Sequence, residues 1–128
     1  MKLLKYTLIG LVTVMVIVVF IGFLLPSNHQ ISESIVIDAP VGTVFGEVNN
    51  FKHWNNWSPW QGKDPNAIIS YDGPESGVGS KMVWHSDNPK VGKGSQEIMV
   101  SEPNKHIKTI LKMVGWNTVS HGVWNFEE

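Results

Sequence analysis

The side chains that could perform acid–base or nucleophilic chemistry are few and widely spaced in this sequence. The candidates for a hydrolase or a cyclase are Tyr71, Asp72, His85, Glu97 and His121. A nucleophile needs a base within hydrogen-bond reach, and no local pairing or elbow-type motif supplies one here. Each histidine is therefore interpreted as a surface residue or a satisfied core residue. No catalytic residue is predicted, and an enzyme stays an alternative hypothesis.

Metal and nucleic-acid chemistry have equally little support. The chain has no cysteine, which excludes disulfides, thiolate metal sites and a cysteine nucleophile. Its histidines show no paired spacing on one element, as metal ligands would. The formal net charge is −1 and there is no arginine, so a basic stripe for phosphates is absent. We predict no metal, no cofactor and no nucleic-acid partner.

An apolar run covers residues 6–25, YTLIGLVTVMVIVVFIGFLL. As a helix it would be about 30 Å long, which matches the hydrocarbon core of a bilayer. Lys2 and Lys5 precede it, and no cation follows closely, so the positive-inside tendency leaves the N-terminus in the cytoplasm. We predict a single-pass cell-membrane anchor over residues 1–25 and an extracytoplasmic domain. The alternative is a cleaved signal peptide, for which Leu25-Pro26-Ser27 is a poor cleavage site.

The remainder of the chain has an α+β pattern behind a short linker at residues 26–30. Alternation predicts a first strand at 31–38. Pro40 suits the first position of a helix, and the apolar stripe that follows it predicts that helix. Trp54 and Trp57 are three residues apart and fit a short second helix that ends at Ser58-Pro59. Turn signals then separate five further predicted strands, at 67–71, 80–85, 94–101, 105–114 and 119–127.

Several segments in register resemble the SRPBCC (START-like) superfamily of polyketide cyclase/dehydrase and lipid-transport proteins. They are IDAPVGTVF at 37–45, WNNWSPW at 54–60 with Asp64-Pro65 after it, GPESGVGSKMVW at 73–84 and VGKGSQE at 91–97. The resemblance covers residues 31–128, and a bacterial subgroup of the family also begins with one membrane helix. It implies the helix-grip fold, a curved antiparallel sheet around a long C-terminal helix with an apolar cavity between them.

The sequence departs from the family where it ends. Members continue into a last strand and the long helix, whereas this chain stops at Glu128. Without these elements the inner face of the sheet loses its cover, and an apolar patch of that size is a liability in water. We therefore expect a domain that is incomplete at its C-terminus, and the alternatives are cover by a second copy or by the bilayer.

The resemblance implies a binding module for a lipid or another hydrophobic small molecule. The candidate pocket residues are Trp57, Trp60, Met82, Trp84, Met99, Leu111, Met113 and Trp124. The competing interpretation is that these side chains fill the core, as methionine and tryptophan commonly do. A third hypothesis is a protein-interaction domain in which Trp54, Trp57 and Trp60 form an aromatic anchor. Packing of these rings as a lid on the sheet is the simpler explanation for them.

Overall fold

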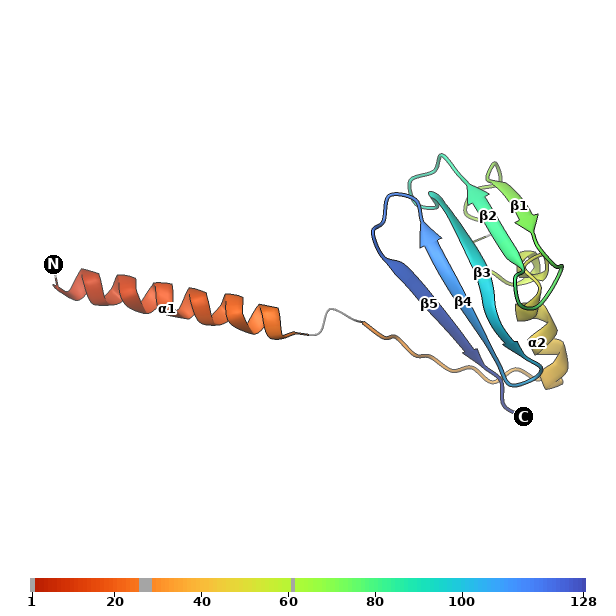
Figure 1. The fold of residues 1–128 in the computed structure, drawn as a ribbon, viewed down its shortest axis with the longest axis horizontal. Coiled ribbons are helices and arrows are strands. Elements are labelled where there is room, and N and C mark those ends of the chain that lie inside the picture. The colour runs from red at the N-terminus through yellow and green to blue at the C-terminus, as the bar shows by residue number, and fades with distance from the viewer. Residues whose placement is uncertain (1, 26–28, 61) are drawn as a thin grey trace. The chain divides into compact units, whose positions relative to one another are not determined.

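The computed structural model describes residues 2–25, 29–60 and 62–128 (Figure 1). The chain divides into two compact units, Met1–Val36 and Ile37–Glu128.

The first unit contains α1, Lys2–Leu24, a helix of 23 residues without a buried side chain. Its mean hydropathy reaches 2.8, so it is long and apolar enough to cross a membrane. The hydroxyls of Thr7 and Thr13 donate to carbonyls one turn earlier, at 2.9 Å from Leu4 O and 2.9 Å from Ile9 O. These bonds pair both threonine hydroxyls within the helix, as an apolar environment requires. The prediction of a membrane-length apolar helix is confirmed.

The predicted strand at 31–38 is wrong. Residues 29–37 have no regular secondary structure, and their side chains are exposed, including Ile35 at 83% and Val36 at 98%. A strand exists only where its backbone pairs with a neighbour. The five strands of the sheet pair among themselves and none pairs with this segment. The alternation of side chains was present, but the hydrogen-bonding partner was not.

The second unit is α+β, as expected, with two short helices and an open antiparallel sheet of five strands. Its elements are α2 (Val41–Asn49), η1 (His53–Asn56), β1 (Ile68–Asp72), β2 (Lys81–His85), β3 (Lys93–Glu102), β4 (His106–Met113) and β5 (Val119–Asn125). The strands follow one another across the sheet in the order β1-β2-β3-β4-β5. Each predicted strand from residue 67 onward lies within two residues of an observed one.

The helix α2 begins one residue later than its sequence suggests. Pro40 has an extended ψ of 139° and occupies the N-cap position, so the first helical residue is Val41. The apolar stripe nevertheless faces inward as expected, because Phe45 and Val48 are buried. The short second helix is also present as the 3-10 helix η1, and it ends before Ser58-Pro59.

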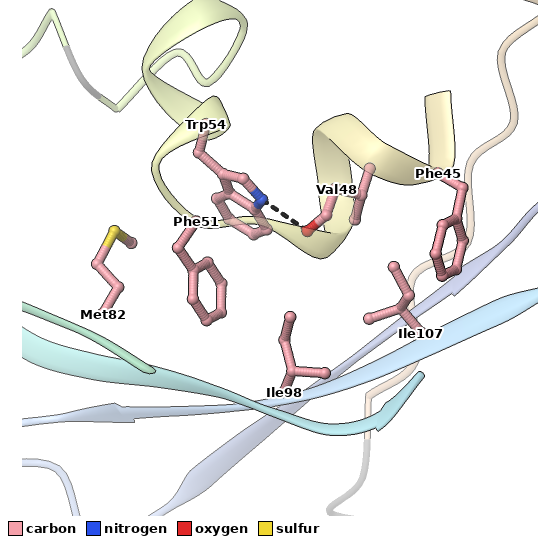
Figure 2. Close-up of a cluster of buried hydrophobic side chains, with 7 residues drawn as sticks. All are labelled: Phe45, Val48, Phe51, Trp54, Met82, Ile98 and Ile107. Carbon is pink, nitrogen blue, oxygen red and sulfur yellow. Dashed lines mark hydrogen bonds between the residues drawn. The ribbon is translucent and has the colours of Figure 1, made fainter. Parts of the chain in front are cut away.

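One face of the sheet, called here the inner face, packs against α2 and η1 (Figure 2). Phe51 and Trp54 point from the helical side toward the sheet, and Ile98 and Ile107 point up from β3 and β4 to meet them. The exposed fractions of Phe51, Ile98 and Ile107 are 1% or less. Fully burying apolar side chains of this size is worth about 1.5–3 kcal/mol each, so this contact holds the helices on the sheet.

Candidate functional site

The inner face extends beyond the core that α2 and η1 cover. The strand register places Trp84, Leu111 and Met113 on this face, in line with the core residues Met82 and Ile107. All three side chains are only partly buried, whereas Met82 and Ile107 are buried. This part of the inner face, where Trp84 packs against the core, is therefore an apolar surface with side chains partly open to solvent, and it is called here the apolar shelf.

Glycines shape the floor of the apolar shelf. A Cβ on Gly94 would lie 2.5 Å from Trp84 Cζ2 and 2.6 Å from Lys112 O, so the Trp84 indole rests directly on the backbone of β3. Similarly, a Cβ on Gly92 would be 3.5 Å from Met113 Cε. The absence of side chains at these positions lets large apolar groups lie flat on the sheet instead of standing above it.

Three tryptophans form an aromatic cluster at the border between the core and the apolar shelf. The ring centroids of Trp54 and Trp57 are 4.9 Å apart, and those of Trp54 and Trp124 are 5.7 Å apart at 73°. The rings of Trp57 and Trp124 are 6.0 Å apart at 77°. Edge-to-face pairs of this kind contribute about 0.5–1.5 kcal/mol beyond the area that they bury. The cluster fixes the orientation of each ring.

The indole N–H groups of this cluster differ in their partners. Trp54 Nε1 donates to Val48 O at 3.0 Å, and Trp57 Nε1 donates to Glu47 O at 3.3 Å. Trp124 Nε1 is buried and has no hydrogen-bond partner among the described residues. Buried donors are nearly always paired, so this unpaired N–H is an exception within the described part of the chain.

Other polar groups converge on the same spot. A Cβ on Gly122 would lie 2.6 Å from Thr109 Oγ1 and 3.5 Å from Trp124 Nε1, so both atoms stand over this glycine. Gln96 Nε2 donates to Thr109 Oγ1 at 3.2 Å, and both residues are buried. Gln96, Thr109 and the Trp124 N–H therefore form a small buried polar cluster among apolar side chains, and this cluster is called here the polar notch. Ligand sites commonly combine apolar walls with a few polar groups of this kind.

The structure brings some of the predicted pocket residues together and separates others. Trp84, Leu111, Met113 and Trp124 share the inner face, and Trp57 contacts Trp124. Met82 belongs to the core. Met99 stands at a register shift between Ile98 and Val100 and is 45% exposed. Trp60 is 57% exposed in a loop, where Lys63 Nζ lies 3.8 Å from its ring centroid.

The sequence reasoning did not identify Gln96, Thr109 or Gly122 as site residues. Thr109 could have been found from alternation, since it lies between Ile107 and Leu111 on the same face of β4. Gln96 and Gly122 become neighbours of Thr109 only through the pairing of β3, β4 and β5. No local pattern in the sequence predicts that these three residues are neighbours.

The titratable candidates lie apart from the notch and from one another. His85 on β2 and His121 on β5 are separated by three strand spacings, or about 14 Å. His85 Nε2 is 3.5 Å from the exposed carboxylate of Asp87. Asp72 and Glu97 both flank Lys81 in the cross-strand register. In the described residues these positions only face an opposite charge across the strands, and they place no nucleophile beside a base.

A half-open hollow of about 360 Å³ lies beside His85, lined by Asp64, Asn66, Ile68, His85, Asp87 and Asn88. Next to it, the Ser86 hydroxyl donates to Asp64 Oδ2 and accepts from the Asn88 N–H at 3.0 Å. The serine hydroxyl thus donates one hydrogen bond and accepts another, and together these bonds join two loops. Its role is structural. Within residues 2–25, 29–60 and 62–128, no group of three or more histidine, aspartate or glutamate side chains could hold a metal ion.

Comparison of the chain with protein-family models, with curated proteins and with solved structures gives no match. The function must therefore be inferred from the side chains and their geometry.

Proposed function

We propose that this chain is a membrane-anchored binding module for a hydrophobic small molecule or lipid, related to the START-like family in its globular part. The anchor is α1, and the lysines before it favour a cytoplasmic N-terminus and a domain on the extracytoplasmic side. The ligand lies on the apolar shelf between Trp84, Met113 and the aromatic cluster. In a helix-grip arrangement this is the face that would line the cavity.

The unpaired Trp124 N–H is the observation that carries this proposal. An unsatisfied buried donor costs about 1–3 kcal/mol, and a ligand acceptor at that point would remove this cost. The surrounding Trp84, Leu111 and Met113 offer apolar contact on the same face. The ligand class that fits both features has a long apolar body and one hydrogen-bond acceptor, as a fatty acid or another simple lipid does.

The protein-interaction hypothesis gains no specific support. Its proposed anchor would need three accessible rings, but Trp54 is only 7% exposed. The N–H groups of Trp54 and Trp57 are used internally. These two rings behave as a lid on the sheet.

The indole N–H resonances of the full chain, labelled with ¹⁵N-tryptophan in detergent micelles, test the proposal. Palmitate should move the Trp124 resonance, which the Trp124→Phe variant identifies by its loss. Because a net hydrogen bond is worth about 0.5–1.5 kcal/mol, this variant should bind palmitate roughly three- to tenfold more weakly. Hexadecane has the same apolar body without an acceptor and should leave the resonance in place.

The Trp60→Phe variant is the matched control, because it removes an exposed indole outside the shelf and should bind palmitate like the parent chain. A Trp124 resonance that no member of a lipid panel moves would contradict the proposed site. Equal palmitate affinity of Trp124→Phe and the parent chain would exclude the role of the N–H.

A further inference from the structure

Three loops meet at one end of the domain, called here the loop end. They are the β2–β3 connection at 86–92, the β4–β5 turn at 114–118 and the segment 62–67 before β1; both hairpin connections lie at the same end of the sheet in Figure 1. The Val114 N–H donates to Lys93 O at 2.9 Å. Asn88 Nδ2 donates to Lys63 O at 3.4 Å. These hydrogen bonds make the loop end one continuous surface.

Large apolar side chains are exposed at the loop end. Val114 is 73% exposed and Trp116 is 64% exposed, on either side of Gly115, whose φ of +87° makes the sharp turn. Trp60 adds a third exposed apolar group at 57%. Packing within the domain does not explain these positions. Tryptophan is the residue most typical of the boundary between lipid and water, because its ring is apolar and its N–H remains solvated.

The charge of the loop end is positive. Counted with the residues up to two positions beyond these loops, it carries four lysines, Lys63, Lys90, Lys93 and Lys112, against two aspartates, Asp64 and Asp87. The Asp64 carboxylate accepts the Ser86 hydroxyl, and Asp87 lies 3.9 Å from Lys93 Nζ. Exposed lysines beside exposed tryptophan and valine form the combination that binds an anionic lipid surface.

The opposite end of the sheet has the opposite charge. Asp72, Glu75, Glu102, Glu127 and Glu128 gather there with Lys52, Lys81 and Lys105. Within this set Lys52 Nζ already pairs with Glu75 at 3.2 Å. An anionic surface would attract the loop end and repel this acidic end, so the charge distribution selects one orientation.

The chain between α1 and α2 is long enough to permit that orientation. A Cβ added to Gly42 would lie 3.5 Å from Asn104 Oδ1, which belongs to the turn between β3 and β4. The chain therefore enters the domain at its acidic end. The stretch from Leu24 to Val41 can span about 55 Å when extended. The longest strand, β3, has ten residues and is about 33 Å long. The tether therefore exceeds the length of the domain.

From these observations we infer that the loop end docks on the surface of an anionic bilayer. Trp116 and Val114 enter the interfacial region, and the four lysines contact lipid phosphates. The membrane then has two contacts with this protein, the apolar helix and the loop end. The second contact is reversible and depends on lipid charge, and it does not involve the polar notch.

The absence of cysteine makes a direct test possible, because one introduced cysteine carries the only label. The full chain with Asn117→Cys bears a spin label next to Trp116, in nanodiscs of phosphatidylcholine with phosphatidylglycerol. Collision with a water-soluble nickel chelate should be several-fold lower than at Ser76→Cys, on the loop at the acidic end, and collision with oxygen should be higher. Discs of phosphatidylcholine alone should reduce this difference.

Two variants connect the result to the named residues. Val114→Ser with Trp116→Ser should decrease the docked population about tenfold or more, because apolar burial is lost. Lys90→Gln with Lys112→Gln should decrease it in the anionic discs only. Unchanged thermal unfolding of these surface variants shows that the fold is intact.

Three results would overturn the inference. A label at position 117 that stays fully accessible to nickel in anionic discs shows that no docking occurs. Protection that the Val114→Ser and Trp116→Ser changes leave intact shows that confinement by the tether is the cause. Protection in native membranes combined with exposure in lipid-only discs shows that the loop end binds a protein instead.

Discussion

Phe51→Ala is expected to reduce the free energy of unfolding of the domain by about 3–5 kcal/mol. Phe51 lies between α2 and η1, is 1% exposed and meets the Trp54 ring at a centroid distance of 5.1 Å and 68°. Its side chain projects into the contact between the helices and the sheet (Figure 2). A domain of this size has a total stability of about 5 kcal/mol or a little more. The variant should therefore keep only about 0–2 kcal/mol of stability and unfold at a much lower temperature than the parent domain.

Near-UV circular dichroism of the full chain in micelles measures this effect, because the tryptophan cluster gives a signal only when it is packed. Val83→Ala is the control, since it removes a 37%-exposed side chain from the opposite face of the sheet. Its unfolding midpoint should shift only slightly. If Phe51→Ala has the same unfolding midpoint as Val83→Ala, the contact in Figure 2 does not hold the helices on the sheet.

Gly73→Ala should destabilise the domain by about 3 kcal/mol or more. Gly73 has φ of +77°, and an added Cβ would overlap the backbone oxygen of Gly79. The overlapping atom belongs to the backbone, so it cannot rotate away as a side chain could. The N–H of Gly79 donates to Ile98 O at 2.9 Å, so the loop cannot move without losing this hydrogen bond to β3. Left-handed strain and steric overlap each cost about 1–3 kcal/mol.

Gly77→Ala separates these two costs. Gly77 has φ of +79°, and no atom lies within 4 Å of an added Cβ. This variant should lose only about 1 kcal/mol, from backbone strain. Thermal unfolding of the two alanine variants side by side gives the difference. Equal midpoints would mean that the contact between Gly73 and Gly79 imposes no constraint.

The local elements were predictable because their signals are local. Five strands and two short helices follow from alternation, apolar stripes and turn residues, and the bounds of these five strands agree within two residues. Segment 31–38 shows the limit of such signals. Its alternation is as regular as that of β4, but a strand also needs a neighbour, and the neighbour is a property of the whole fold.

The candidate site was predictable only in part, for the same reason. The types of Trp84, Leu111, Met113 and Trp124 suggested an apolar surface, and the register places them on one face. Met99 and Trp60 have equally apolar side chains, but a register shift and a loop place them elsewhere. Apolar character predicts burial or binding in general, whereas the position of a side chain depends on which strands pair.

The sequence by itself determined the apolar helix, the order of the secondary-structure elements and the exclusion of cysteine chemistry, because each depends on residue types along a short stretch. Only the tertiary structure decided that Gln96, Thr109 and Trp124 converge over Gly122, and that Trp116 and four lysines share one end. Those groups come from different strands and loops. Their meeting depends on sheet register and loop contacts, which are interactions between residues far apart in the chain.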